Sequence, residues 1–323
     1  MQRSPLIPHA IRYFIHHTPL PLRCAVAMSA SATNKDGAAA WNVRSSSSPP
    51  LAHPPTHSPT HSPTHPTPLQ ANQTQEEFMK HDAVILVDPA DTITGHASKY
   101  TSHRFESPTP TGLLHRAFSV FLFDQNNRLL LQQRAASKIT FDSVWTNTCC
   151  SHPLWSDGNA NVNADVNSEV DDVDAVVATG TAPGAARAAI RKLQHELGID
   201  PGVFATQFTF LTRLHYCAKD QHNPEWGEHE MDYILFHRLP CDGADLPMAP
   251  HPDEVGDTRW VTKAELAEMM REGNGLRWSP WFRIIAKEFL GTWWDEMDEA
   301  LRVRGKFVDG KIHAIGLDDR DGR

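Results

Sequence analysis

The sequence predicts an α/β or α+β fold, because segments with strand character alternate with segments of helical periodicity along residues 76–318. The clearest strand signal is a pair of apolar runs, 117–123 and 128–132, which flank the turn-forming residues 124–127 and so predict a β-hairpin. The clearest helical signal is an apolar stripe over 186–197. A domain of this length can bury a full core.

Shorter signals of the same two kinds predict the remaining elements. Further strands are expected at 83–87, 208–214 and 233–236, where apolar and β-branched residues cluster. Further helices are expected at 265–272, 281–290 and 293–302.

The 186–197 helix also carries signals for its two ends. Pro183 lies near its start and Gly198 just past its end, in the order that helix termini prefer. Its stripe is formed by five residues at helical spacing, namely Ala186, Ala189, Ile190, Leu193 and Leu197.

The composition changes near residue 75 and separates an N-terminal extension from the domain. Residues 1–75 hold 12 of the 24 prolines and a single acidic residue, Asp36. The first 35 residues combine Arg, Ser and Thr without any acidic residue, which is typical of an organelle transit peptide. We expect a plastid destination, with the mitochondrion as an alternative, or the cytoplasm or peroxisome if translation starts at Met28. An unstructured extension without a targeting role is the competing interpretation.

Three segments are expected to add little to the core. Residues 44–69 contain Thr-His-Ser-Pro repeats, which predict a Pro-rich linker, although histidine at every fourth position could also bind metal. Residues 156–184 are rich in Asn, Asp, Ala and Val without clear periodicity, and are expected to form a surface insertion. Residues 319–323 are expected to be a short tail.

Charge and hydropathy exclude two classes of partner. The chain has a net charge of −9, and residues 76–323 carry 38 of its 39 acidic residues against 25 Lys and Arg, so nucleic acid is not an expected partner. No run of about 18 apolar residues is present, so no membrane span is expected. We expect a monomer that acts on a small molecule, and an anionic substrate would need a local basic patch.

Two short segments concentrate chemically useful side chains. Cys150 and His152 lie two residues apart within Trp145–Pro153. Glu228 and Glu230 have the spacing of one strand face, so both can aim at one point. Thiol, imidazole and paired carboxylates are the groups needed to move protons next to a bound metal. A lone cysteine is usually a small buried apolar residue, but the polar residues that precede Cys150 and the nearby histidine favour a chemical role.

A metal site is a second possibility that the residues raise. Three imidazoles and two carboxylates would suit Zn²⁺ or Mn²⁺ better than Ca²⁺. The chain has 19 histidines, so chemistry alone leaves the choice of ligands open, and a zinc-stabilised binding domain without turnover remains possible. The candidate ligands are His103, His115, His152, Glu228 and Glu230.

These segments resemble those of type I isopentenyl-diphosphate isomerases, a family of the Nudix superfamily. The similarity covers roughly residues 80–315, and it includes 112–123 and 134–138. The segment 191–199 also resembles a Nudix helix, but Lys192 and His195 stand where a Nudix hydrolase needs glutamates. The resemblance implies an α/β fold, namely a Nudix-like α/β/α sandwich with a central mixed sheet.

The resemblance also implies a reaction, the reversible conversion of isopentenyl diphosphate to dimethylallyl diphosphate. It places Cys150 and Glu230 on opposite faces of the allylic unit of the substrate, with Tyr216 hydrogen-bonding near the carboxylate. It makes Trp281 a wall of the pocket and gives Cys149 no chemical role. A Nudix-type diphosphate hydrolase is the alternative function, which the degraded acidic helix disfavours.

The resemblance finally implies how the substrate and metals are held. It places one Zn²⁺ or Mn²⁺ among His103, His115, His152, Glu228 and Glu230. It assigns Mg²⁺ at the diphosphate to Glu196, although a Lys192–Glu196 pair is equally an ordinary ion pair on one helix face. The basic residues expected to bind the diphosphate are Lys99, Arg134, Lys138 and Lys192.

Overall fold

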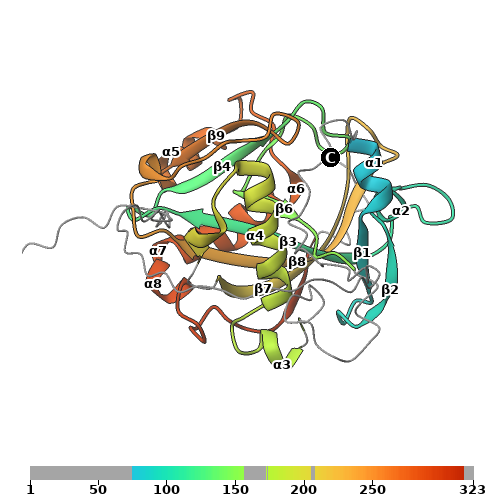
Figure 1. The fold of residues 1–323 in the computed structure, drawn as a ribbon, viewed down its shortest axis with the longest axis horizontal. Coiled ribbons are helices and arrows are strands. Elements are labelled where there is room, and N and C mark those ends of the chain that lie inside the picture. Colours follow the sequence, from blue (N-terminus) through green and yellow to red (C-terminus); the bar gives the residue numbers. More distant parts are fainter. Residues whose placement is uncertain (1–74, 156–171, 173, 205–207, 316–323) are drawn as a thin grey trace, which may run out of the picture.

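The computed structural model describes residues 75–155, 172, 174–204 and 208–315, in which helices cover a central mixed sheet (Figure 1). The predicted targeting segment, linker and tail lie outside these residues, except that the first helix begins at Gln75, one residue inside the predicted extension. None of the described helices is long and apolar enough to cross a bilayer.

The sheet has ten strands, and its main path runs in the order β10-β7-β8-β3-β1-β2. Strand β4 pairs with β3, β5 and β9, and β6 pairs with β3. The β3–β8 and β10–β7 pairs are parallel and the other pairs are antiparallel, so the sheet is mixed as predicted. The strands are β1 (Ala83–Val87), β2 (Ile93–Ser98), β3 (His115–Phe123), β4 (Leu129–Arg134), β5 (Trp145–Thr146), β6 (Cys149–Ser151), β7 (Thr209–Lys219), β8 (Gly227–Arg238), β9 (Val255–Val261) and β10 (Ile312–Ile315).

The described helices lie before and between these strands. The α-helices are α1 (Gln75–His81), α2 (Lys99–His103), α3 (Asp174–Val177), α4 (Pro183–Leu197), α5 (Lys263–Met269), α6 (Pro280–Ile285), α7 (Gly291–Asp295) and α8 (Met297–Ala300). A π-helical turn, Ala286–Leu290, joins α6 to α7, and two 3₁₀ turns cover Pro201–Phe204 and Gly243–Asp245. In Figure 1, α1 and α2 lie beside β1 and β2, and α5 lies beside β9 at the opposite side of the molecule.

Strand β3 runs through the middle of the molecule, and all nine of its residues are buried. Its side chains alternate between two apolar cores, as the period of a strand requires. Phe118 and Val120 join the core that α4 covers. Phe121 and Phe123 join the core that α6, α7 and α8 cover. Both faces of the sheet are therefore covered by helices, which confirms the predicted α/β/α layering.

The predicted hairpin forms between β3 and β4, with Phe123 opposite Leu129. The Asp124 side chain stabilises the turn because it accepts hydrogen bonds from the backbone N–H groups of Asn126 and Arg128, at 2.9 and 2.8 Å. Asn127 has a φ of 57°, a conformation that asparagine tolerates better than most residues.

Helix α4 begins and ends where its terminal signals predict. Pro183 is its first residue, and Gly198 closes it with a φ of 65° and N–H bonds to the last turn. The buried face is rotated slightly from the predicted stripe. Ala185 and Ala188 are fully buried, whereas Ala186 and Ile190 lie at the edge of the core.

The prediction that residues 156–184 form a surface insertion is wrong for the C-terminal part of this range. Val177 of α3 is 1 % exposed and belongs to the core under α4. Asp172 is also 1 % exposed, and its carboxylate accepts the N–H groups of Gly184 and Ala185 at the start of α4. Asp172 therefore stabilises the helix start and Val177 joins the core, while other residues of this part, such as Asp174, remain exposed. Residues 156–171 and 173 lie outside the described residues.

The last predicted helix, 293–302, is in fact two short ones. Glu296 has φ −113° and ψ 44°, outside the helical region, so the chain breaks between α7 and α8. The break lets Trp293 and Trp294 on one side and Met297 on the other pack into the same core.

Candidate active site

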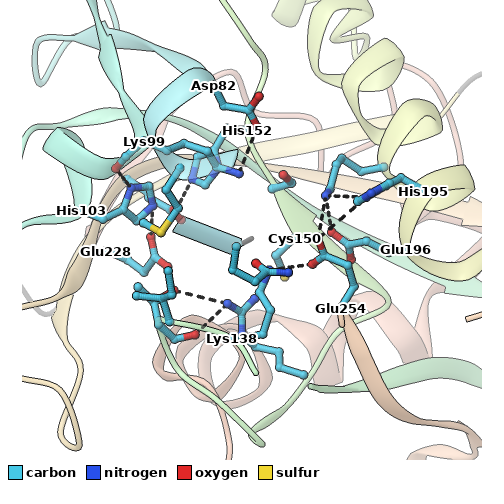
Figure 2. Close-up of a pocket in the computed structure, with 18 of the residues that line it drawn as sticks. Asp82, Lys99, His103, Lys138, Cys150, His152, His195, Glu196, Glu228 and Glu254 are labelled. Carbon is cyan, nitrogen blue, oxygen red and sulfur yellow. Dashed lines mark hydrogen bonds and ion pairs between the residues drawn. The ribbon is translucent and has the colours of Figure 1, made fainter. Parts of the chain in front are cut away.

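A cavity of about 260 Å³ opens where α1, α2, α4 and α6 approach the edges of β6, β7 and β8. Figure 2 shows three groups of side chains around it, with His103, His152 and Glu228 on one side and Glu196 and Glu254 on the other. Cys150 lies between these two sides.

Strand register aligns the central groups of this cavity. Glu230 of β8 lies opposite His115 of β3 on one side and opposite Tyr216 of β7 on the other. On β6, Cys150 lies opposite Ser119 of β3. Because register fixes these pairs, residues far apart in the sequence share one face of the sheet.

The five predicted metal ligands come together. One ligand atom from each of His103, His115, His152, Glu228 and Glu230 can be chosen so that all of them lie within 4.8 Å of one another. The shortest contacts are His103 Nε2 to Glu228 at 2.8 Å and His152 Nε2 to Glu230 at 2.9 Å. Because successive residues of a strand point to opposite faces, His229 faces the other way, and its Nε2 lies 3.1 Å from that of His215.

Backbone contacts orient two of the imidazoles towards the cluster. The Nδ1–H of His103 donates to Lys99 O, and that of His115 donates to Leu113 O, both at 2.7 Å. The Nε2 atoms then carry the free lone pairs that a metal requires. Burial lowers the pKa of His103 to about 3, and it lowers the pKa of His115 and His152 well below the usual range, so all three are neutral near pH 7.

The donor set fits a transition metal. His115 Nε2 is buried inside the cluster without a hydrogen-bond partner. Glu228 Oε2 lies 2.8 Å from His103 Nε2, but no hydrogen lies between them, because His103 carries its hydrogen on Nδ1. Buried polar atoms of this kind are costly unless another partner satisfies them. Burial also raises the pKa of Glu228 and that of Glu230, the latter further because Glu228 lies beside it. A bound cation would satisfy the orphaned atoms and offset the charge of both carboxylates.

Glu230 is shared between the metal cluster and the cavity. One carboxylate oxygen faces His152, and the other accepts a short hydrogen bond from the Tyr216 hydroxyl. Burial, with the neighbouring Glu230 carboxylate, raises the pKa of Tyr216 well above its usual range. Tyr216 therefore keeps its proton and acts as a donor to Glu230.

Polar side-chain atoms contact the thiol of Cys150, although the residue packs against the apolar core. Its Sγ is 3.0 Å from Asn147 Oδ1 and 3.1 Å from Trp281 Nε1. Burial, with the carboxylate of Asp232 nearby, raises the pKa of the Cys150 thiol to about 12. Cys150 is therefore a neutral thiol near pH 7 and can donate a proton.

Asn147 orients this thiol, a role that the sequence did not indicate. Both hydrogens of its Nδ2 are used by backbone carbonyls, those of Val120 at 3.0 Å and Cys149 at 3.1 Å. Its Oδ1 must then face Cys150 and accept the S–H. The residue lies in the Trp145–Pro153 segment, but only the folded contacts separate it from its polar neighbours.

Trp281 has two roles at once. It is 3 % exposed and packs in the core with Phe282 and Ile285. Its ring also lines the cavity and lies 5.4 Å from the ring of Phe141 at nearly a right angle. The wall beside Cys150 is therefore aromatic.

The four predicted basic residues, Lys99, Arg134, Lys138 and Lys192, all line the cavity. Burial lowers the pKa of Lys99 to about 8, and the charge of Lys192 contributes to this shift. Arg134 is less free than expected, because its guanidinium already donates to the carbonyl oxygens of Phe141 and Thr140, at 3.0 and 2.8 Å. Lys138 is 2.6 Å from Glu254.

Glu196 projects from α4 into the basic side of the cavity. Its Oε1 lies 3.1 Å from Lys192 Nζ, and its Oε2 accepts from Gln132 Nε2 at 3.2 Å. Cys149 Sγ also lies 3.5 Å from Glu196 Oε2, so this thiol supports the carboxylate from the core side, in contrast to the absence of a role expected for Cys149. Mg²⁺ in proteins is usually bound through one or two carboxylates together with substrate phosphates, so Glu196 has the chemistry of a candidate ligand.

Twelve of the thirteen predicted site residues line the same cavity, and the thirteenth, His115, lies in the metal cluster behind it. Two carboxylates that line the cavity were missed, Asp82 and Glu254. Glu254 lies in the loop before β9, where no periodicity or motif marks it.

Comparison with known proteins places these features in one family. The NUDIX domain model matches residues 180–282. Isopentenyl-diphosphate Delta-isomerase I of Camptotheca acuminata is 44 % identical over 230 residues, which are 70 % of this chain and 88 % of that protein. The chloroplastic Isopentenyl-diphosphate Delta-isomerase II of Arabidopsis thaliana is 42 % identical over 247 residues, 75 % of this chain and 78 % of that protein. Isopentenyl-diphosphate delta-isomerase of Phaffia rhodozyma is 41 % identical over 75 % of this chain and 88 % of its own. The chain therefore belongs to the isopentenyl-diphosphate delta-isomerase family.

Proposed function

We propose that Cys150 and Glu230 carry out the isomerisation of isopentenyl diphosphate to dimethylallyl diphosphate in this protein. The observation that carries the proposal is that a neutral thiol and a tyrosine-bonded carboxylate line one buried cavity beside an aromatic wall. Two proton-transfer groups with no solvent between them are what an allylic shift requires.

The reaction balances without another reactant. Protonation of the terminal alkene carbon forms a C–H bond and leaves a tertiary carbocation at the neighbouring carbon. Loss of a proton from the next carbon, on the diphosphate side, forms the new double bond. Cys150 and Glu230 serve as the two proton-transfer groups and exchange roles in the reverse direction. The face of Trp281 stabilises the cation, and the burial of the cavity keeps water from trapping it.

The His/Glu cluster would hold one Zn²⁺ or Mn²⁺ through His103, His115, His152, Glu228 and Glu230. When bound, such an ion supplies positive charge that lowers the pKa of its ligands. Glu230 belongs to this cluster and also faces the cavity, so the same carboxylate can be oriented on one side and exchange a proton on the other.

The basic side of the cavity would hold the diphosphate. Lys99, Lys138 and Lys192 present ammonium groups to it, with Arg134 beside them, and Glu196 would hold Mg²⁺ against the phosphates. The anion would thereby fix the allylic unit between Cys150 and Glu230, because both sides of the cavity open onto Cys150 (Figure 2).

The reaction is tested in D₂O with isopentenyl diphosphate and Mg²⁺, with products resolved by NMR. We expect dimethylallyl diphosphate and deuterium in the carbon skeleton. Glu230→Gln should stop the exchange of allylic protons, a loss of at least about 10²-fold, while pyrophosphate still binds. Metal content must be measured in parallel, because Glu230 also lies in the His/Glu cluster. Release of phosphate or pyrophosphate without deuterium uptake would instead indicate a Nudix-type hydrolase.

We also propose that the N-terminal extension directs the protein to the plastid. Its composition, rich in Arg, Ser and Thr with no acidic residue in the first 35 positions, supports this proposal, and so do the relatives named chloroplastic. Residues 1–74 fused to a fluorescent protein should bring it into plastids. Uniform cytosolic fluorescence would reject the targeting role and leave the catalytic proposal unaffected.

A further inference from the structure

Glu254 is a buried carboxylate at the centre of a site built from cations, and the proposed reaction does not use it. It is 6 % exposed and lines the cavity. Its Oε2 is 2.6 Å from Lys138 Nζ, and its Oε1 is 3.8 Å from Lys192 Nζ and 3.9 Å from His195 Nδ1. In Figure 2 it lies beside Glu196 and His195, on the side of the cavity opposite the metal cluster.

The backbone holds this carboxylate in place. Glu254 N donates to His251 O at 3.0 Å, and Glu254 O accepts from Ala135 N at 3.0 Å. The second bond ties the loop before β9 to the turn that carries Lys138. The backbone of Glu254 is therefore fixed beside the basic residues, and ion pairs with Lys138 and Lys192 hold its side chain there.

A fixed carboxylate in an anion site has a clear electrostatic consequence. It neutralises part of the charge of Lys138 and Lys192, and it repels any anion that approaches them. Its own ionised form is stable there, because Lys138 and Lys192 lower the pKa of Glu254 despite its burial. A diphosphate without metal carries more negative charge than its magnesium complex, so it meets the larger repulsion.

We propose that Glu254 makes diphosphate binding dependent on the divalent cation, because it selects the metal complex over the free anion. This inference rests on the proposed diphosphate site. Glu254 and Glu196 both approach Lys192, at 3.8 and 3.1 Å, so two carboxylates oppose a metal-free diphosphate at one point. A cation bound with the substrate offsets both of them.

The test is calorimetric binding of inorganic pyrophosphate to the full chain, in metal-depleted buffer and with saturating Mg²⁺. Wild-type protein should bind pyrophosphate much more tightly with Mg²⁺. In Glu254→Gln, metal-free pyrophosphate should bind about tenfold more tightly than in wild type, and the gain from Mg²⁺ should shrink accordingly. The matched control is Asp253→Asn, the same chemical change at the adjacent, exposed residue, which should behave as wild type.

Other outcomes overturn the inference. If Glu254→Gln weakens binding only when Mg²⁺ is present, Glu254 is a ligand of the cation and not a charge selector. If it leaves both affinities unchanged, the carboxylate is purely structural. If wild-type protein binds no pyrophosphate in either buffer, the proposed diphosphate site itself fails, which separates the two proposals. Near-UV circular dichroism checks folding, and Glu254→Ala provides the same comparison if the glutamine variant is unstable.

Discussion

The adjacent cysteines show how one residue step changes a side chain's role. Successive residues of a strand face opposite sides of the sheet. Cys150 faces the cavity and its Asn147 acceptor. Cys149 is fully buried in the core that α4 covers, with its Sγ 3.5 Å from Glu196 Oε2. The chemistry of the pair therefore depends on strand geometry and not on thiol reactivity alone.

Substitution of each cysteine tests this difference. Cys150→Ala or Cys150→Ser should abolish isomerisation, because a hydroxyl has too high a pKa to replace a thiol near pH 7. Cys149→Ala should keep most of the turnover and raise the Mg²⁺ concentration needed for half-maximal rate, because Glu196 loses one contact. Steady-state rates over a Mg²⁺ series measure both effects. Equal loss at the two positions would contradict the assignment.

Lys99 gives the site a specific pH dependence. Its folded pKa of about 8 lies below the usual value for lysine, so the empty site loses this charge as the pH rises through 8. Diphosphate binding favours the protonated form, so affinity should fall by up to about tenfold per unit above pH 8. Lys99→Arg stays charged and should remove this decline relative to wild type. Pyrophosphate titrations between pH 7 and 9.5 measure it, and parallel profiles would refute the role of Lys99.

At the scale of elements, local signals predicted the fold well where they were self-contained. The 83–87 strand, the hairpin at 124–127 and helix α4 each have their stop signals nearby in the sequence. Strands β7 and β8 are longer than predicted. The prediction fell short because polar residues such as His215, Glu228 and Glu230 interrupt the apolar pattern on which it relied. Strands β5 and β6 are two and three residues long, too short for any periodicity.

The residues of the candidate site were predicted from the resemblance to a family. The contacts that support them could not be predicted in this way. Asn147 and Glu254 acquire their roles from partners that folding brings to them, Val120 and Lys138 among others. Val177 is buried only because α3 packs beneath α4, so its polar neighbourhood in the sequence was misleading.

The end of α4 offers a test of element stability. Gly198 has a φ of 65°, and a Cβ there would lie 2.8 Å from the carbonyl oxygen of Ala249. Gly273 also has a positive φ, of 88°, but no atom lies within 4 Å of its added Cβ. We expect Gly273→Ala to cost about 1 kcal/mol from backbone strain, and Gly198→Ala to cost more, about 2 kcal/mol or above. Urea unfolding measures both, and equal costs would show that the contact with Ala249 relaxes freely.

At the scale of the whole molecule, the His/Glu cluster joins four segments of the chain, namely α2, β3, β8 and the residue that follows β6. A bound metal would therefore stabilise the fold by linking them. Purified protein should contain about one transition metal, and His152→Ala should lose it. Its removal should lower the melting temperature by on the order of 10 °C. Unchanged stability and activity after complete metal removal would exclude this role.

The affinity of the cluster for metal should also depend on pH. The raised pKa of Glu230 and of Glu228 means that protons compete with metal up to a higher pH than for ordinary carboxylates. The imidazoles compete little, since the pKa of His103 is only about 3. Metal affinity should therefore fall as the pH drops through the raised carboxylate range, with proton release on binding. Chelator competition at several pH values measures this slope, and a flat profile would contradict it.

Helix α1 begins at Gln75, one residue before the predicted start of the domain, and this residue contacts the site. Gln75 Oε1 accepts from Lys138 Nζ at 3.2 Å, and Gln75 lines the cavity. Deletion of residues 1–74 should leave turnover and melting temperature nearly unchanged. Deletion of 1–75 should weaken substrate binding slightly through Lys138. Assays of both truncations, side by side, decide whether Gln75 contributes.

The pairing of β6 and β8 with β3 makes the position of the ligands independent of the lengths of the connections between these strands. His152 and Glu230 meet because β6 and β8 both take their register from β3, not because of the number of residues between them. The connection from β6 to α4 can lengthen from one lineage to another without moving a single ligand. A shift of β8 by one position would instead turn Glu228 and Glu230 away from the cluster and bring His229 into it. We therefore expect natural length variation to gather in the connections and to be absent from these three strands.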